Sequence, residues 1–580
     1  MTQEDAAAFY DARPWEQHYG SGVERAFTAP PLQQVADIAR ESARQFPSRP
    51  AFTTCLENGL HGTLTCAEVD AYADAFAAWL MAEADIQPGD RVALQMPNSL
   101  PYPVAVYGTL RAGAVLVNVN PLYTPREMRH QLADSGARVL VISDLFADKL
   151  GSALPETAVE RVVLTGIADF FPWARRTLVH TVLRLKKEIP TAPEDALRFT
   201  DVIAQGQQLE PPAWPERGPD DLALLQYTGG TTGVAKGAEL RHRHVLANLS
   251  QINAVAGDAI RPGEDVVLTA LPLYHIFAFT FNLLTFHYHG CRNVLCPSPR
   301  PVDKLRKAFE RFPVTKFSGV NLLFHGLLQA DWFRNNPPKN LDLAIAGGTA
   351  LHRSTAEQWR DLIGNAPLEG YGLTETSPVL AVNPPLGENR LGTVGLPVPG
   401  TDVRIVDDNG QPLPQGEVGE IVGRGPQVFE GYWQRPDETR ATLRNGWFHT
   451  GDVGYMDAEG YIYIVDRKKD MIDVSGFNVY PNEVEEALAE HEGIAEVAVL
   501  GAPRGEAGEA VVAFVVPRDE TLTEAQVSEF ARTRLTSYKV PRLILFREEL
   551  PKSPVGKLLR RELRDEARAA MAAHEQEAAA

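Results

Sequence analysis

The stretch Tyr227-Thr-Gly-Gly-Thr-Thr-Gly-Val-Ala-Lys-Gly237 decides how the rest of the chain is interpreted. It lies between an apolar run at 222–225 that is typical of a strand and a helical pattern at 243–253. Four glycines in eleven positions let the backbone approach a ligand, while two adjacent threonine hydroxyls and one lysine supply donors and a positive charge. The stretch therefore predicts a loop that holds the phosphates of ATP. A glycine-rich surface turn is the alternative.

The spacing of this loop excludes a Walker-type nucleotide site. A Walker loop ends in Gly-Lys-Ser/Thr, whereas here Ala235 precedes Lys236 and Gly237 follows it. The loop is thus expected to hold phosphate in a protein that is not a kinase or GTPase of that class.

Composition limits the class of protein further. A chain of 580 residues exceeds the size at which one core stops growing, so at least two domains are expected. The net charge of −19 argues against sequence-independent binding to nucleic acid, which depends on positive charge. Four scattered cysteines are too few for a disulfide framework, and the first residues lack the pattern of a signal peptide. The cysteine usage favours a reducing cytoplasm, and because no window is apolar over the length of a membrane span, a soluble or peripheral protein is expected.

Alternating helical and strand-like segments predict an α/β fold. Apolar runs at 91–96, 115–119, 138–142 and 161–164 alternate with helical patterns, and the same rhythm returns between 265 and 371. This pattern is typical of parallel strands covered on both faces. Residues 31–215 and 216–389 are therefore expected to form two doubly wound sheets side by side, with their ligand-binding loops close together.

The rest of the chain has a different pattern. Between 390 and 466, short strands separated by turns predict a small antiparallel β-barrel or sandwich. Residues 467–580 predict a compact α+β module that ends in an alanine- and glutamate-rich tail. The expected division is an N-terminal domain, 1–466, and a C-terminal domain, 467–580.

The segment 170–187 combines aromatic and aliphatic side chains with five basic residues in an acidic protein. This composition is typical of a helix that lies on an anionic bilayer surface. A helix packed on its own domain with a solvated face is the alternative, so peripheral membrane contact is a hypothesis.

Three further motifs carry useful chemistry. In Gly370-Tyr-Gly-Leu-Thr-Glu-Thr376, after an apolar strand, the tyrosine can stack on a purine, the threonine can reach phosphate and the carboxylate can hold Mg²⁺. Thr450-Gly-Asp452 offers a carboxylate to ribose hydroxyls, although a capping aspartate would look the same. Lys557 follows a glycine-containing turn, and an isolated surface lysine is its alternative interpretation.

In this order, and over nearly the whole chain, the motifs resemble the acyl-adenylate-forming superfamily of acyl- and aryl-CoA ligases, luciferases and peptide-synthetase adenylation domains. The chain is most similar to bacterial long-chain fatty acid CoA ligases. Three other motifs support this resemblance: Leu271-Pro-Leu-Tyr-His-Ile-Phe277, Asp466-Arg-Lys-Lys-Asp-Met-Ile472 and Ser475-Gly-Phe-Asn-Val-Tyr-Pro-Asn482. Gly230 and Ala235 replace the commoner serine and proline of the superfamily, and both occur in the long-chain group.

The resemblance implies a reaction in two halves that uses ATP, Mg²⁺ and coenzyme A. A carboxylate attacks ATP to give acyl-AMP and pyrophosphate, and the CoA thiol then displaces AMP to give a thioester. The small domain would be mobile and would rotate about Lys469, presenting Gly476 to the pantetheine arm. Fatty acid, ATP and CoA are the expected partners. The oligomeric state is left open, a homodimer included.

The resemblance also implies roles for individual residues. The expected polyphosphate ligands lie in or beside the loop: Thr228, Gly229, Gly230, Thr231, Thr232, Gly233 and Lys236. Tyr371, beside Gly372, would stack on adenine, and Thr374 would touch the α-phosphate. Glu375 would ligate Mg²⁺.

On the far side of the nucleotide, Asp452 and Arg467 would hold the ribose. Lys557 would reach in from the small domain and stabilise the charge that develops at the α-phosphorus. With Thr232, Glu375 and His275 it completes the expected catalytic set.

The acid substrate is inferred from residues 270–286. Their apolar side chains could wall an acyl tunnel with His275 at its mouth, although ordinary core is the alternative role for most of them. Gly347 and Gly348 leave room where a bulky side chain would block such a tunnel. A fatty acid CoA ligase is the favoured interpretation. The alternatives are a fatty acyl-AMP ligase that loads a carrier protein, a CoA ligase for a shorter or aryl acid, and an acyl-binding protein without activity.

Overall fold

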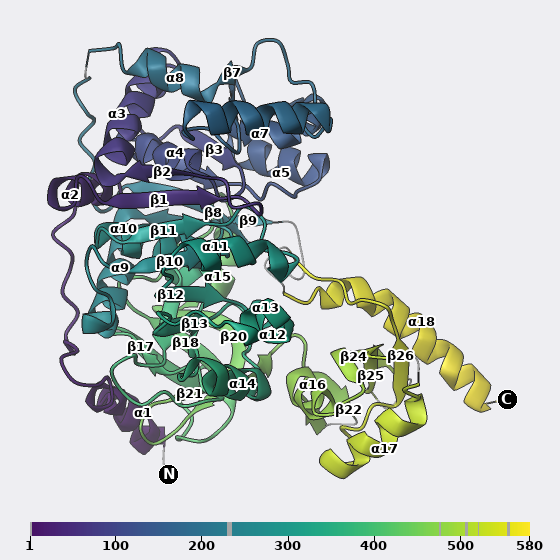
Figure 1. Ribbon diagram of the computed structural model, residues 1–580. Helices are drawn as coiled ribbons and strands as arrows, with labels where there is room; N and C mark the ends of the chain where they lie inside the picture. Colours follow the sequence, from purple (N-terminus) through teal and green to yellow (C-terminus); the bar gives the residue numbers. More distant parts are fainter. Residues whose placement is uncertain are drawn as a thin grey trace.

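The computed structural model describes residues 3–210, 212–228, 235–474, 477–504, 508–519, 521–553 and 557–579. Figure 1 shows a large body that contains the N-terminal and central parts of the chain, with a smaller C-terminal unit beside it. The large part is built on mixed and antiparallel sheets and the small part is α+β, as the sequence predicted.

The first sheet contains, among the described residues, seven strands in the order β7-β6-β5-β3-β4-β8-β9. All neighbours are parallel except β8 and β9, which form an antiparallel hairpin. Its strands are β3 (Arg91–Gln95), β4 (Val115–Asn118), β5 (Ala137–Ser143), β6 (Arg161–Thr165), β7 (Leu197–Arg198), β8 (Leu222–Thr228) and β9 (Lys236–Arg241). Its helices are α3 (Cys66–Ala82), α4 (Pro101–Arg111), α5 (Pro125–Ser135), α6 (Leu150–Ala153), α7 (Trp173–Leu185) and α8 (Phe199–Gly206).

Local sequence explains where these helices begin and end. At the start of α5, the Thr124 hydroxyl accepts a hydrogen bond from the amide of Glu127, whose carboxylate in turn accepts from the amide of Thr124. Pro125 occupies the first turn, where no amide donor is needed, and Gly136 ends the helix at φ 62°. The helix therefore starts and stops for local reasons before it packs on the sheet.

The second sheet has nine strands within the described ranges, in the order β16-β15-β14-β13-β12-β10-β11-β1-β2. These are β1 (Pro50–Cys55), β2 (His61–Thr65), β10 (Val266–Thr269), β11 (Arg292–Leu295), β12 (Lys316–Gly319), β13 (Leu343–Ala346), β14 (Leu368–Gly372), β15 (Val379–Val382) and β16 (Leu396–Pro397). Two early strands thus complete a sheet whose other strands come from later in the chain.

Helices alternate with most strands of the second sheet, as the sequence predicted. They are α2 (Asp37–Gln45), α9 (His242–Ala256), α10 (Phe286–Tyr288), α11 (Arg306–Arg311), α12 (Asn321–Gln329), α13 (Asp331–Asn335) and α14 (Arg353–Ile363), with a π-helical segment at Ala278–Thr285. Every residue of the π-helical segment is buried. The remaining helix of the N-terminal region, α1 (Gln3–Asp11), packs its Tyr10 against the third sheet.

The third sheet is antiparallel and has five strands in the part of the chain that is described. They are β17 (Asp402–Val406), β18 (Gly419–Arg424), β19 (Leu443–Arg444), β20 (Trp447–Met456) and β21 (Ile462–Arg467), with α15 (Pro436–Thr442) beside them. In β20 and β21, Asp452 pairs with Arg467 and Val453 with Asp466, so two expected ligands are neighbours by strand register.

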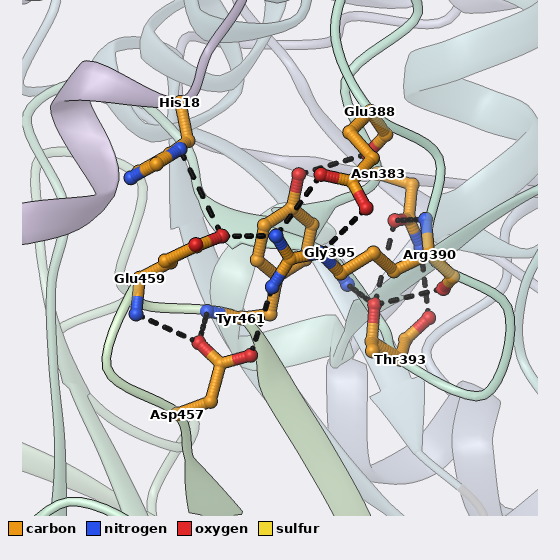
Figure 2. Close-up of polar contacts among 9 residues, drawn as sticks. All are labelled: His18, Asn383, Glu388, Arg390, Thr393, Gly395, Asp457, Glu459 and Tyr461. Atoms are coloured by element: carbon orange, nitrogen blue, oxygen red, sulfur yellow. Dashed lines mark hydrogen bonds and ion pairs between the residues drawn. The ribbon is translucent and has the colours of Figure 1, made fainter.

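A cluster around Arg390 attaches the third sheet to the second (Figure 2). The Arg390 guanidinium lies 3.0 Å from the Glu388 carboxylate and 3.1 Å from that of Asp457, also pairs with Glu459, and lies 4.0 Å above the Tyr461 ring. The amide of Ile462 donates to the Gly395 carbonyl at 2.9 Å. These contacts fix the start of β21 on the loop after β15, and so set Asp452 and Arg467 relative to β14.

The small C-terminal unit combines a hairpin, a three-stranded sheet and three helices in the described residues. Its elements are β22 (Ile472–Val474), β23 (Phe477–Val479), α16 (Pro481–Ala489), β24 (Ile494–Pro503), β25 (Glu509–Pro517), α17 (Glu524–Arg534), β26 (Leu543–Phe546) and α18 (Arg560–Ala579). No helix among the described residues is long and apolar enough to cross a membrane. All four cysteines are buried and free.

Candidate active site

A continuous cleft of about 3060 Å³ lies where the strand ends of the sheets face the small unit. Residues from β8, β9, β14, β20 and β21 line it, as does Lys557 from the C-terminal part. The cleft thus brings together the described members of the predicted site, which come from segments more than 300 residues apart. Gly229, Gly230, Thr231, Thr232, Gly233 and Gly476 lie outside the described residues.

The segment predicted to be a phosphate loop lies between two antiparallel strands. Thr228 at the end of β8 pairs with Lys236 at the start of β9, and α9 begins only at His242. The loop therefore closes a hairpin, whereas the sequence suggested a direct passage from a strand to a helix. The Lys236 Nζ lies 2.9 Å from a Glu438 oxygen and 3.8 Å from the centre of the Tyr432 ring. Its charge is held at the cleft between a carboxylate and an aromatic face.

Tyr371, Asp452 and Arg467 form one polar group. The Tyr371 hydroxyl donates to Oδ2 of Asp452 at 2.6 Å, and the Arg467 Nε lies 3.1 Å from Oδ1. Burial and the adjacent Asp452 carboxylate raise the pKa of Tyr371 well above its usual value, so it stays a neutral donor. The tyrosine expected to stack on adenine thus lies directly beside the carboxylate expected to bind ribose.

Glu375 lies on the short 3₁₀ turn Thr374–Thr376 that follows β14. Its side chain is buried, and Oε1 accepts a hydrogen bond from the Tyr432 hydroxyl at 2.6 Å. The other carboxylate oxygen makes no hydrogen bond within the described part of the chain, so it could serve as a ligand to a Mg²⁺ ion. No group of three or more potential ligands in that part could hold a metal by itself. One carboxylate therefore fits a Mg²⁺ ion that is bound mainly through ATP phosphates.

Gly372 allows the backbone to turn between Tyr371 and this 3₁₀ segment. A Cβ atom at that position would lie 1.8 Å from the carbonyl oxygen of Pro378. Only glycine fits there without moving the backbone, so Gly372 provides the space for the turn that carries Thr374 and Glu375. Its role in nucleotide binding stays a prediction.

Lys557 lies in the cleft close to Asp452 and Arg467 and to His275. Burial, with a further contribution from the Arg467 charge, lowers the pKa of Lys557 to about 8. Burial and the charge of Lys557 lower the pKa of His275 to about 4, so the imidazole is neutral near pH 7. The small unit is therefore oriented with its lysine inside the cleft.

Lys469 follows β21 and lines the same cleft. Burial and the Arg467 charge lower its pKa to about 8. On its N-terminal side, Lys468 lies 2.8 Å from the Asp408 carboxylate of the large part, and on its C-terminal side Asp470 accepts from Arg564 at 2.9 Å within the small part. The position predicted to be the hinge thus separates contacts made to two different bodies.

The cleft continues along an apolar wall. Its lining includes Phe277 and Phe281 from the predicted tunnel segment, and Ile252, Ile260 and Ile345 from α9, the loop after it and β13. A Cβ on Gly347 would lie 3.1 Å from Phe277, whereas one on Gly348 would meet only Val320, at 3.8 Å. Much of the remaining segment, Phe279 and Phe286 included, is fully buried core.

Two residues of the cleft were not predicted from the sequence. Tyr432 contacts both Glu375 and Lys236, but it lies outside every motif and is brought there by an isolated bridge to Ala238 in β9. Glu369 is buried in β14, where its carboxylate accepts from the Leu351 amide at 3.0 Å. Burial raises the pKa of Glu369 to about 8. Its place two residues before Tyr371 was the available signal, because alternate residues of a strand face the same side.

Two family models match the chain. The model described as AMP-binding enzyme matches residues 39–433, and the one described as AMP-binding enzyme C-terminal domain matches residues 483–557. Together they account for both parts of the fold.

Curated relatives match almost end to end. The chain is 48% identical over 556 residues to a long-chain-fatty-acid–CoA ligase of Escherichia coli O6:H1, covering 96% of this chain and 98% of the relative. It is 42% identical to a protein of the same name from Haemophilus influenzae, covering 95% and 98%.

Solved structures share the fold. An ATP-bound MatB from Rhodopseudomonas palustris has a TM-score of 0.79 at 31% identity, covering 92% of this chain and 99% of that one. The anthranilate CoA ligase AuaEII in complex with anthranoyl-AMP has a TM-score of 0.81 at 27% identity, covering 94% and 99%. The chain therefore belongs to the AMP-binding enzyme family.

Proposed function

We propose that this protein is an ATP- and Mg²⁺-dependent ligase that joins a long-chain fatty acid to coenzyme A through an acyl-AMP intermediate. The observation that carries the proposal is the single cleft in which Lys236, Tyr371, Asp452 and Lys557 converge beside an apolar wall. Relatives that are 42–48% identical over nearly their full length bear the name of this activity.

The first half-reaction forms acyl-AMP. A carboxylate oxygen of the acid attacks the α-phosphorus of ATP, and the bond to the pyrophosphate oxygen breaks. Tyr371 holds the adenine, Asp452 and Arg467 the ribose, and Thr228 and Lys236 the polyphosphate. Lys557 stabilises the charge on the α-phosphate as it is attacked, and a neutral His275 adjoins the entering carboxylate.

Glu375, together with phosphate oxygens, would hold the Mg²⁺ ion, which would supply positive charge to neutralise the polyphosphate. The hydrogen bond from Tyr432 fixes one Glu375 oxygen and so orients the other. Thr232, with Gly229, Gly230, Thr231 and Gly233 beside it in the sequence, completes the proposed phosphate site.

The second half-reaction needs a different arrangement of the same parts. The CoA thiolate attacks the acyl carbonyl carbon, the bond to the AMP oxygen breaks, and AMP leaves. Lys557 occupies the cleft, so the thiol needs it to withdraw. We place the boundary between the domains, 1–466 and 467–580, at the end of β21. Lys469 is the pivot, and its rotation brings Gly476 to the pantetheine arm.

The apolar wall favours an aliphatic acid. Phe277, Phe281, Ile252, Ile260 and Ile345 can surround an acyl chain, and each buried methylene contributes about 0.8 kcal/mol, or roughly fourfold in affinity. Longer acids should therefore bind better until the wall is filled. An aryl acid would gain little from the outer part of it.

The test is pyrophosphate release with ATP over saturated acids of increasing length, with and without CoA. We expect release that rises with chain length, and thioester only when CoA is present. Thioester on a carrier protein with none on CoA would favour the fatty acyl-AMP ligase. Release of no pyrophosphate with any acid would refute the activity.

We also propose that α7 contacts an anionic membrane surface. Four of the nine large hydrophobic side chains exposed in the described residues lie on this helix: Trp173, Leu178, Val182 and Leu185. The last three are spaced four and three residues apart and so share one face, which is 40–79% exposed. Figure 1 places α7 on the outside of the first sheet.

The positive charge of this segment indicates the kind of surface that the exposed face contacts. The segment 170–187 carries five basic residues and no acidic ones, in a chain of net charge −19. A bilayer with anionic headgroups matches both its apolar stripe and its positive charge.

Sedimentation with vesicles tests this contact. Changing Leu178, Val182 and Leu185 to Gln, or the five basic residues to Glu, should each abolish sedimentation with phosphatidylglycerol-containing vesicles, and the parent should not bind neutral vesicles. Sedimentation of both variants at the parent's level would contradict the proposal. Pyrophosphate release reports separately that each variant is folded.

A further inference from the structure

Asp466 makes a contact that crosses the turn between the two parts of the chain. It lies in β21, is 1% exposed, and accepts through Oδ2 from the amide of Asn482 at 2.8 Å. Asn482 is the second residue of α16, and its side-chain amide donates back to the Val465 carbonyl at 3.3 Å. The last strand of the large part is thus bonded to the first helix of the small part.

The same asparagine is connected to the segment that carries Lys557. Its Oδ1 accepts from Nη2 of Arg560 at 3.0 Å. That guanidinium also donates to both oxygens of Glu485, at 2.7 and 2.8 Å, and to the Val499 carbonyl at 3.3 Å. Arg560 begins α18, three residues after Lys557. Two consecutive hydrogen bonds, from Asp466 to Asn482 and from Asn482 to Arg560, therefore connect the hinge strand to the segment that carries Lys557.

The neighbouring contacts do not span the turn. Lys468, on the N-terminal side of the pivot Lys469, pairs with Asp408 and Glu420 of the large part, and Asp470, on its C-terminal side, pairs with Arg564 of the small part. A rotation at Lys469 would leave these pairs intact and would separate Asp466 from Asn482. The bond between Asp466 and Asn482 is thus specific to the orientation in which Lys557 lies in the cleft.

We propose that Asp466 is a positioning residue for acyl-AMP formation: its carboxylate holds the amide of Asn482 and so keeps the small domain in the orientation that inserts Lys557. This inference rests on the proposed two-step function. Release of the bond accompanies the change to the thioester-forming orientation. Asp466 touches neither substrate nor the reacting atoms and acts through Lys557.

The test measures the two half-reactions separately: pyrophosphate release from ATP and fatty acid, and thioester formation from supplied acyl-AMP and CoA. From the usual strength of a hydrogen bond to a buried charged group, we expect Asp466→Ala to slow pyrophosphate release by about 10- to 100-fold. The second rate should be unchanged or higher. Asp466→Asn, which keeps an oxygen acceptor, should lose less. Asp408→Ala, which removes a carboxylate beside the same turn, is the matched control and should change neither rate.

A double-mutant cycle separates positioning from a structural effect. If Asp466 acts through Lys557, Asp466→Ala should lower adenylation little further in a Lys557→Ala protein. Independent, multiplicative losses would overturn the proposal, as would equal loss of both half-reactions in Asp466→Asn. Failure of the proposed function itself would be seen in the parent, which would release no pyrophosphate.

Discussion

Replacing Lys557 by Ala should separate the two half-reactions. The lysine is buried in the cleft beside Arg467 and Asp452, and removing one preorganised charge at the reacting phosphate costs about 2.7–4 kcal/mol, or roughly 10²–10³-fold in rate. We expect this loss in pyrophosphate release. Thioester formation from supplied acyl-AMP should be retained, because the lysine has no part in it.

The charge of Lys557 also predicts the direction in which the rate of adenylation changes with pH. Because the pKa of Lys557 is lowered to about 8, its charge is present below that pH and is lost as pH rises through it. The kcat/KM of adenylation for ATP, which reports the free enzyme, should therefore fall above about pH 8. Lys469 also has a pKa of about 8, so the variants must distinguish the two.

Lys557→Arg provides that distinction. An arginine stays charged at all accessible pH values, so the alkaline fall should move upward in this variant even if its rate is lower. Lys552→Ala is the control. It removes another lysine close in sequence, which pairs with Glu496, and it should behave like the parent. Equal loss of both half-reactions in Lys557→Ala, or an unchanged alkaline fall in Lys557→Arg, would refute the assignment.

Three other substitutions test the rest of the site. Glu375→Gln should shift the Mg²⁺ dependence of pyrophosphate release to higher concentration, because the carboxylate charge is lost while the contact to Tyr432 can remain; an unchanged Mg²⁺ titration would contradict the metal role. Gly372→Ala should lower the free energy of unfolding by about 1–3 kcal/mol, because its Cβ would collide with the Pro378 carbonyl; denaturation at the parent's midpoint would show that the turn can adjust. Lys469→Pro should slow thioester formation more than adenylation, because proline restricts rotation at the pivot; equal rates in parent and variant would argue against a hinge there.

Much of the fold could be predicted because the deciding signals are local. The mainly apolar runs at 91–96 and 138–142 became β3 and β5, whose residues are almost all buried because the sheet is covered on both faces. Within the rhythm expected between 265 and 371, α14 formed, and its buried Trp359 lies opposite a charged face. Tyr371, Asp452 and Arg467 lie together as expected, because β14 and the β20–β21 pair bring them to one cleft.

What could not be predicted depends on contacts between distant segments. The strand β9 has only six residues, does not alternate strictly between buried and partly exposed positions, and contains glycine and alanine, so its sequence gives a weak strand signal. Tyr432 reaches Glu375 only because β9 forms a bridge to it. The Arg390 cluster joins side chains from separate loops in Figure 2, and no spacing along the sequence encodes it.

The central claim is that the acid is activated as acyl-AMP, and the fate of its carboxylate oxygen tests this most directly. A fatty acid labelled with ¹⁸O in both carboxylate oxygens should be converted to thioester with ATP and CoA, and the products analysed by mass spectrometry. Attack on the α-phosphorus predicts one ¹⁸O in each AMP, one in each thioester and none in pyrophosphate. Label in inorganic phosphate or pyrophosphate, or AMP without label, would contradict the account.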